Sequence, residues 1–196
     1  MSDNYAVFGN PIGHSRSPDI HAAFADQTGQ SIAYQKQAVA VDGFAAAADA
    51  FFAAGGKGLN ITAPFKQDAY SYAARLSQRA RRAGAVNTLT LQEDGTISGD
   101  TTDGVGLVRD MRQNLGWQIR GKRVLLLGAG GAVRGVLESL LAEQPQHIVI
   151  ANRTLGRARE LAQKFGAEAV LLAEIPAQLS NADIIITSTA SQLPIL

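Results

Sequence analysis

Lys66 and Asp103 carry the amine and the carboxylate of this sequence that are best placed for proton transfer. Lys66 closes the stretch 60–66, and Asp103 lies in the polar segment 99–104. Adding a hydride to a ketone leaves an alkoxide that must take up a proton, which a partly shielded lysine can supply. Each residue also has an ordinary explanation, because Lys66 fits a solvated lysine in the first turn of a helix and Asp103 fits a helix N-cap.

Hydroxyl and amide side chains accompany these two groups along the chain. They are Ser15, Ser17, Thr62 and Asn87, each expected where a strand gives way to a loop. Ligands bind at such junctions in open α/β sheets, and these groups suit a polyhydroxylated acid. Taken singly, Ser17 is equally well a helix cap and Asn87 a polar residue of an edge strand.

A glycine-rich turn follows the apolar run 124–127. Such an unbroken run is typical of a parallel strand that is buried on both faces, and a helix is expected after the turn. Bare backbone and unpaired N–H groups at that helix N-terminus would bind a dinucleotide pyrophosphate. The residues concerned are Gly128, Ala129, Gly130, Gly131 and Ala132. Because Val133 stands where a third glycine would complete the usual pattern, an ordinary strand-to-helix turn stays possible.

The corner after the next strand (147–151) selects the cofactor. The residues there are Asn152, Arg153 and Thr154, with Arg157 one helical turn later and no acidic residue among them. A carboxylate at this place would bind the ribose of NAD, whereas arginines bind the 2′-phosphate of NADP. The alternative is a pair of surface arginines, but cations are unfavourable at a helix N-terminus unless an anion is bound. We therefore expect NADP (NADPH).

An α/β fold must position these groups. We expect an N-terminal α/β substrate domain with a mixed, mainly parallel sheet (1–101), followed by a Rossmann-like doubly wound domain (102–196). A hairpin turning at 94–95 adds antiparallel strands to the first sheet. We expect a strand over 32–41, a basic helix over 75–82 and a helix from Gly43 that Gly55 and Gly56 close. Ser17 should cap the first helix, with Pro18 at its first position.

Composition excludes several classes of function. The 196 residues carry 18 basic and 17 acidic side chains, so a nucleic-acid or membrane-surface partner is not expected. Without cysteine there are no disulfides, thiol nucleophiles or thiolate metal sites, and we expect no bound metal. The chain begins without a signal-like segment and has no apolar run that could cross a bilayer, so the expected location is the cytoplasm. Monomer and homodimer stay equally open.

Taken together, the chain resembles the shikimate dehydrogenases. Six stretches carry the resemblance, in the family's order and across almost the whole chain: GNPIGHSRSP (9–18), NITAPFK (60–66), GAVNT (84–88), TDG (102–104), GAGGA (128–132) and NRT (152–154). The resemblance implies NADP-linked interconversion of 3-dehydroshikimate and shikimate, a reductive step in the synthesis of aromatic amino-acid precursors. It also accounts for Val133, because members generally lack the third glycine.

The resemblance further implies roles for the candidate residues. Lys66 would protonate the forming alcohol, and Asp103 would hold Lys66 and a substrate hydroxyl. The substrate carboxylate would be bound by Ser15 and Ser17, and the ring hydroxyls by Thr62 and Asn87. Arg153, Thr154 and Arg157 fall where members bind the 2′-phosphate.

Members of the family continue beyond the point matched by Leu196, through more strands and a helical segment that supplies a glutamine to the substrate. We therefore expect a chain that is either truncated at its C-terminus or incompletely traced. A chain that ended at Leu196 would have an incomplete NADP domain, weak dinucleotide binding and poor turnover. The loop at 188–194 is also expected to be shorter than the family's. Two alternatives stay open: a quinate/shikimate enzyme with relaxed cofactor use, and a non-catalytic NADP-binding regulatory relative.

Overall fold

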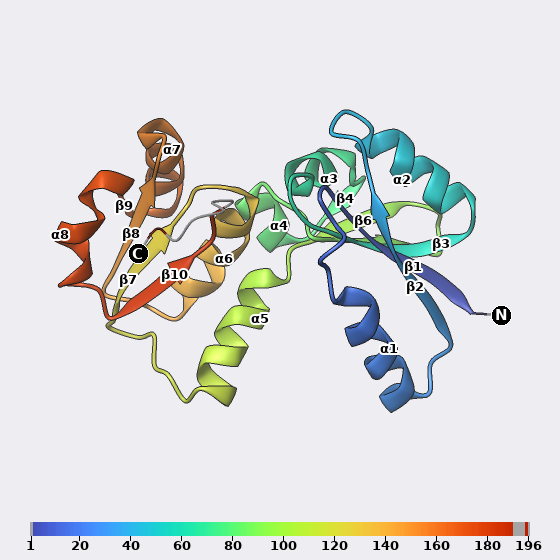
Figure 1. Cartoon of the computed structure of the whole chain (residues 1–196), viewed down its shortest axis with the longest axis horizontal. Helices are drawn as coiled ribbons and strands as arrows, with labels where there is room; N and C mark the ends of the chain where they lie inside the picture. Colours follow the sequence, from blue (N-terminus) through green and yellow to red (C-terminus); the bar gives the residue numbers. More distant parts are fainter. Residues whose placement is uncertain (1, 190–194, 196) are drawn as a thin grey trace. The chain divides into compact units, whose positions relative to one another are not determined.

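The computed structural model describes residues 2–189 and 195, and the loop predicted at 188–194 lies largely outside them. The chain forms two compact units, one ending at Thr102 and the other beginning at Asp103. Each unit has its own sheet (Figure 1). Within the described residues, no helix has the length and apolar character that a membrane span requires.

The first unit is built on a six-stranded mixed sheet in the order β2-β1-β3-β5-β6-β4. Strands β2, β1 and β3 are parallel, β5 is antiparallel to both β3 and β6, and β4 is parallel to β6. Their bounds are β1 Asp3–Gly9, β2 Ile32–Ala38, β3 Gly56–Ile61, β4 Arg75–Leu76, β5 Thr88–Leu91 and β6 Ile97–Asp100. The predicted hairpin is confirmed as the β5–β6 pair.

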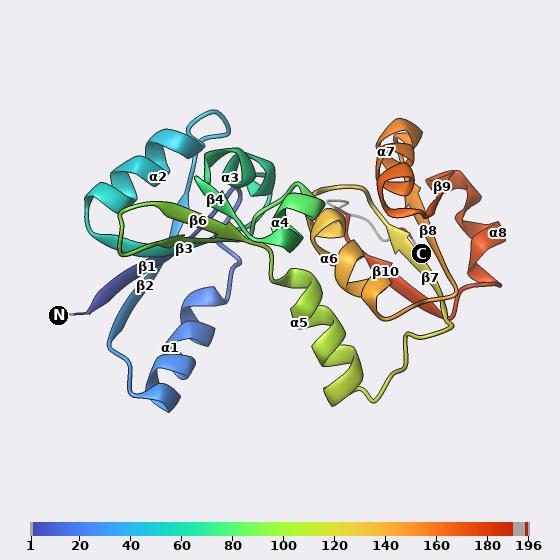
Figure 2. The same ribbon diagram turned by 180° about the vertical axis from the view of Figure 1, so that it is seen from behind.

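Four helices complete this unit: α1 Ser17–Thr28, α2 Phe44–Ala53, α3 Lys66–Tyr72 and α4 Gln78–Ala83. Helices α2 and α3 cover one face of the sheet, and α1 lies against the other (Figures 1 and 2). The core under α2 and α3 is aromatic. Phe8 of β1 packs edge-on against Phe51 with ring centroids 5.8 Å apart, and Phe44 stacks on Phe65 at 5.6 Å. This core anchors the loops that leave β1 and β3.

Two of the predicted elements in this unit are wrong. Residues 75–82 do not form one helix, because Leu76 pairs with Gly99 of β6 and Ser77 then caps α4 by accepting the backbone N–H of Ala80 (3.1 Å). Gly56 does not close α2 but begins β3. Sheet pairing overrides the local helix signal at both places.

Two further boundaries differ from the prediction. Ser17 is the first residue of α1, and Arg16 occupies the N-cap position, so the side chain of Ser17 is not the cap. Strand β2 ends at Ala38 rather than continuing to Val41. Gly29 ends α1 in the left-handed conformation (φ 65°), as expected of a C-cap glycine.

The second unit holds a parallel four-stranded sheet in the order β10-β7-β8-β9. The bounds of its strands are β7 Arg123–Leu127, β8 His147–Asn152, β9 Glu168–Leu171 and β10 Ile184–Thr187. Its helical segments are α5 Asp103–Arg109, the π-helical Asp110–Asn114, α6 Gly131–Ala142, α7 Leu155–Phe165, the 3₁₀ turn Leu172–Glu174 and α8 Ile175–Leu179. The sheet is the predicted doubly wound type.

Strand β7 lies in the middle of this unit's core. Val124 and Leu126 join the apolar cluster on one face of the sheet, and Leu125 and Leu127 join the cluster on the other. This arrangement confirms the prediction of a strand buried on both faces. The chain runs outward from β7 to β8 and β9 and then returns beside β7 as β10, so the strand order reverses there. Ligands of such sheets bind at this reversal, beyond the carboxyl ends of the strands.

Candidate functional site

The loops after β1 and β3 lie against each other and carry Ser15, Ser17 and Thr62. The backbone N–H of Thr62 donates to the carbonyl of Phe8 (2.9 Å). A Cβ added at Gly9 would lie 2.5 Å from the Thr62 side chain, so this close approach requires glycine. Ser15 Oγ donates to Ser17 Oγ at 3.1 Å, and both side chains are half-buried. The structure thus brings these hydroxyl groups to one edge of the sheet.

A cluster of three side chains beside Ser17, namely Tyr34, Asn60 and His21, was not anticipated from the sequence. Tyr34 of β2 donates its hydroxyl to Asn60 Oδ1 of β3 (2.6 Å), and the ring of His21 stacks on Tyr34 with centroids 4.2 Å apart. Burial raises the pKa of Tyr34 to about 12, and a hydrogen bond with Ser17 opposes this shift. Burial also lowers the pKa of His21, and a hydrogen bond with Asn60 opposes that. The serines therefore border a neutral, hydrogen-bonded cluster.

Strands β2 and β3 both pair with β1, and the parallel register places Tyr34 level with Tyr5 and Gly58. Asn60 lies two residues farther along β3, where the Tyr34 hydroxyl reaches it. In the sequence Tyr34 has the appearance of one member of an alternating strand.

Lys66 is the first residue of α3 and is half-buried. The preceding residue, Phe65, is fully buried in the aromatic core, and the carbonyl of Lys66 accepts the N–H of Val86 (2.8 Å). These two contacts fix the backbone of Lys66 just beyond the end of β3. The lysine therefore starts from the same edge of the sheet as Thr62.

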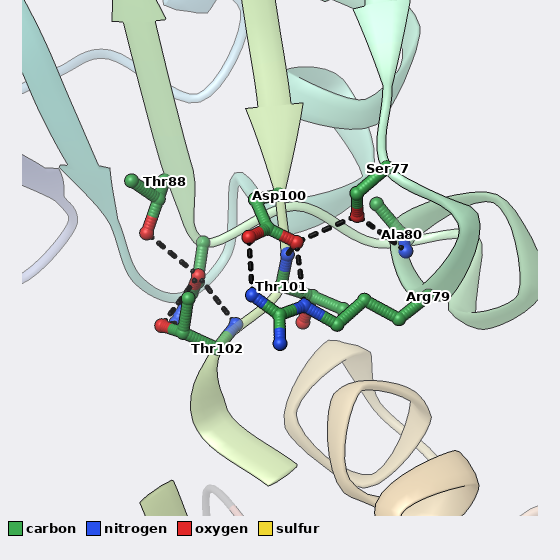
Figure 3. A network of polar contacts seen from close by, with 8 residues as sticks. Ser77, Arg79, Ala80, Thr88, Asp100, Thr101 and Thr102 are labelled. Atoms are coloured by element: carbon green, nitrogen blue, oxygen red, sulfur yellow. Dashed lines mark hydrogen bonds and ion pairs between the residues drawn. The ribbon is translucent and has the colours of Figure 1, made fainter. Parts of the chain in front are cut away.

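Asn87 is buried, with 8% of its surface exposed. It is therefore not a polar residue of an edge strand, which was the alternative to a ligand-binding role. Its backbone bridges β3 and β6, since Ile61 donates to its carbonyl (2.7 Å) and its N–H donates to the carbonyl of Asp100 (2.9 Å). Its side-chain oxygen accepts from the hydroxyl of Thr88 (2.8 Å) and the backbone N–H of Thr102 (3.0 Å). Figure 3 shows the surrounding contacts of Thr88 and Thr102. A backbone N–H is only a donor, so the amide oxygen must face Thr102.

Asp103 is the first residue of α5 in the second unit and is half-buried. The next residue packs α5 tightly on α6, because a Cβ at Gly104 would lie 2.7 Å from the carbonyl of Gly135 and 2.6 Å from Ser139 Oγ. Glycine is therefore required immediately after Asp103, which fixes the start of α5 on α6.

The glycine turn connects β7 to α6. Gly128 has φ +115°, and a Cβ there would lie 2.3 Å from the carbonyl oxygen of Ser188. Gly130 is the N-cap of α6, and a Cβ there would meet no described atom within 4 Å. The first backbone N–H groups of a helix have no partner within it, so open backbone and donors coincide here. Val133, which stands where a third glycine would complete the usual pattern, is fully buried in the core.

The corner after β8 presents exposed Arg153, Thr154 and Arg157. Asn152 Nδ2 donates to the carbonyl of Thr154 (2.9 Å), which fixes the turn into α7. The nearest acid along α7 is Glu160, whose pKa is lowered by a hydrogen bond and an ion pair with Arg134 of α6 (2.8 Å). This pair, which the sequence analysis missed, links α6 to α7 beside the basic corner.

No group of histidine and acidic residues that could hold a metal ion occurs in the described part of the chain. For a dinucleotide, the fit is good. The open backbone at Gly130 suits a diphosphate, and the exposed guanidinium groups of Arg153 and Arg157 suit a 2′-phosphate.

These features define a class of protein, the pyridine-nucleotide oxidoreductases that combine a doubly wound unit with a second α/β unit. Residues 7–89 match the family model described as the shikimate dehydrogenase substrate binding domain, and residues 110–196 match shikimate / quinate 5-dehydrogenase. The chain belongs to the shikimate dehydrogenase family.

Individual relatives agree with this. A protein of Cellvibrio japonicus named shikimate dehydrogenase (NADP(+)) is 60% identical over 195 residues, which is 98% of this chain and 70% of that protein. The crystal structure of an Ael1 enzyme from Pseudomonas putida has a TM-score of 0.86 at 41% identity, covering 100% of this chain and 73% of that one. Shikimate 5-dehydrogenase of Thermus thermophilus in complex with NADP(H) and shikimate has a TM-score of 0.84 at 32% identity, covering 98% and 73%. The resemblance inferred from the six stretches is thereby confirmed, as is the fold class.

Proposed function

We propose that this protein is an NADP-dependent oxidoreductase that interconverts 3-dehydroshikimate and shikimate. The observation that carries the proposal is the 60% identity, across 98% of the chain, with a protein named shikimate dehydrogenase (NADP(+)). The first unit would bind the substrate and the second the cofactor. NADP, when bound, supplies or accepts the hydride.

The substrate's polar groups would be divided between two sets of side chains. Ser15 and Ser17 would donate to the carboxylate, supported by their mutual hydrogen bond and half-buried position. Thr62 and Asn87 would bind ring hydroxyls. The fixed orientation of the Asn87 amide supports this role, because a preset donor loses little entropy on binding.

Proton transfer would fall to Lys66, which would protonate the forming alcohol and take the proton back in the reverse direction. Asp103 would accept a hydrogen bond from a substrate hydroxyl. Lys66 is half-buried with its backbone fixed, which favours a defined approach to the substrate.

The cofactor would be bound mainly by backbone and arginine groups. The diphosphate would lie at the turn between β7 and α6, formed by Gly128, Ala129, Gly130, Gly131 and Ala132. The 2′-phosphate would lie at the corner formed by Asn152, Arg153, Thr154 and Arg157.

The near-neutral net charge of +1 supports a small-molecule substrate rather than a nucleic-acid or membrane partner. Action in the cytoplasm fits a sequence without cysteine. Sedimentation would decide between monomer and homodimer.

The test is to incubate the purified chain with 3-dehydroshikimate and NADPH and to identify the product by mass spectrometry. Formation of shikimate is expected, and absence of any product at high enzyme concentration would contradict the proposal. Parallel reactions with shikimate or quinate as the alcohol and with NADP or NAD as the oxidant would test the relaxed-specificity alternative.

A further inference from the structure

The end of β6 carries an ion pair that the proposed catalytic roles do not use. Asp100, the last residue of β6, accepts two hydrogen bonds from the guanidinium of Arg79, one from Nε at 2.7 Å and one from Nη2. Its carboxylate also accepts from Ser77 Oγ (2.6 Å) and from the backbone N–H of Thr101 (2.8 Å). Figure 3 shows these groups converging on one carboxylate from α4 and from the chain after β6.

The pair is strong for its position near the surface. The Arg79 and Asp100 side chains are 37% and 32% exposed, and two-point contact of this kind is the preferred geometry between guanidinium and carboxylate. The hydrogen bonds from Arg79 hold the pKa of Asp100 at about 2, against the opposing effect of burial. The carboxylate is therefore ionised at neutral pH and is held in place by four hydrogen bonds.

Asp100 also determines the surroundings of Asn87. Its carbonyl accepts the Asn87 N–H, while its carboxylate holds the N–H of Thr101. The next residue, Thr102, donates its own N–H to the Asn87 side-chain oxygen. The segment that orients the Asn87 amide is thus fastened at Asp100, and Arg79 fastens Asp100 to α4.

We propose that Arg79 and Asp100 are positioning residues, which fix the amide of Asn87 for a substrate hydroxyl without touching the substrate themselves. This inference rests on the proposed function, because it assigns to Asn87 a shikimate hydroxyl. It goes further because it assigns part of the substrate affinity to an ion pair that is not among the proposed substrate contacts.

The chain contains a matched control. Arg75 of β4 pairs with Asp94 in the β5–β6 turn at 2.7 Å, with side chains 63% and 48% exposed. That pair joins neighbouring segments of the same sheet but makes no bond to Asn87 among the described residues. Removing either pair removes one arginine–aspartate ion pair, but only the Arg79–Asp100 pair borders the Asn87 amide.

The experiment compares Arg79→Gln, Asp100→Asn and Arg75→Gln with the unmodified chain, by titrating shikimate and, separately, NADP. Loss of a charge-assisted bond that presets a donor is expected to weaken shikimate binding about tenfold in the first two variants. Affinity for NADP should stay within about twofold in all three. The side-chain amide resonances of Asn87 should shift in the first two variants and not in Arg75→Gln.

The double variant Arg79→Gln with Asp100→Asn should bind shikimate no more weakly than Arg79→Gln alone, because the two residues act as one unit. If Arg79→Gln does not fold, Arg79→Lys, which keeps the charge but not the two-point contact, carries the test with about a threefold expected loss. Unchanged shikimate affinity in the folded variants, or an equal loss in Arg75→Gln, would overturn the positioning role while leaving the proposed function intact. Absence of shikimate binding by the unmodified chain would overturn both.

Discussion

The two units present their candidate groups in different ways. In the first unit the groups are side chains held by hydrogen bonds from neighbouring residues, as when the Thr88 hydroxyl and the Thr102 backbone N–H fix the amide of Asn87. In the second unit the proposed diphosphate site is formed by backbone, at Gly128 and Gly130, and the arginines at the corner after β8 are exposed. Selecting among small polyols requires fixed donors and acceptors, whereas a diphosphate requires an open helix terminus. The predictions below test this division, from the largest expected effect to the smallest.

Replacing the proposed proton donor, Lys66, should have the largest effect. The effect should fall on the turnover number and not on cofactor binding. Lys66→Ala is expected to lower the turnover number by about 10²- to 10⁴-fold, the range for loss of a general acid, and to leave NADP affinity nearly unchanged. Steady-state kinetics and a separate NADP titration measure both. Lys57→Ala is the control, since Lys57 is an exposed lysine of the same region in β3. Normal turnover in Lys66→Ala would remove this lysine from the mechanism.

Arg153→Ala should weaken NADP binding about 10- to 100-fold, because a charge-assisted hydrogen bond to phosphate is lost. Binding of NAD, which lacks the 2′-phosphate, should hardly change. Arg159, exposed on the same helix α7 beyond the corner, provides the matched control Arg159→Ala. Equal losses for NADP and NAD would show that Arg153 does not recognise the 2′-phosphate.

Backbone geometry in the second unit is tested by Gly128→Ala, which should lower the free energy of unfolding by about 2 kcal/mol or more. The added methyl meets the carbonyl of Ser188, and φ +115° is unfavourable for alanine. Gly156→Ala, where a Cβ is unobstructed within α7, should instead stabilise the protein by about 0.5 kcal/mol. Denaturant unfolding measures both free energies. Equal stabilities of the Gly128→Ala and Gly156→Ala variants would contradict the claim that position 128 requires glycine.

The Arg79–Asp100 pair predicts a modest pH dependence of stability. Because the folded pKa of Asp100, about 2, is below its ordinary value, the stabilisation is fully present above about pH 4 and disappears as the pH falls towards 2. After allowance for solvent screening, the contribution is about 1 kcal/mol. The stability difference between the unmodified chain and Asp100→Asn should therefore shrink over that range. A difference that stays constant from neutral pH to pH 2 would contradict it.

The elements of the second unit could be predicted from the sequence, because local patterns determine them. The apolar run before Gly128 and the helical repeat after it correctly indicated the strand, turn and helix of the second unit. The residues 75–82 were misassigned because their pairing partner, β6, is more than twenty residues away in the chain. The same reason hid Tyr34 beside Asn60 and Arg79 beside Asp100, since both contacts join segments that only the folded sheet brings together.

The roles of the candidate residues are the part that sequence patterns alone do not determine. Ser17 fitted a helix cap as well as a ligand, and only its place in α1, with Arg16 at the N-cap position, excludes the cap. Asn87 fitted a polar residue of an edge strand, and its burial and its hydrogen bonds to Ile61, Asp100 and Thr102 exclude that.

The most direct test of the account is the initial rate of shikimate oxidation by the unmodified chain with NADP and, separately, with NAD. The account predicts shikimate-dependent reduction with a clear preference for NADP, reported as the ratio of kcat/KM values. Absence of shikimate-dependent reduction with either nucleotide, or equal kcat/KM values for NADP and NAD, would contradict it.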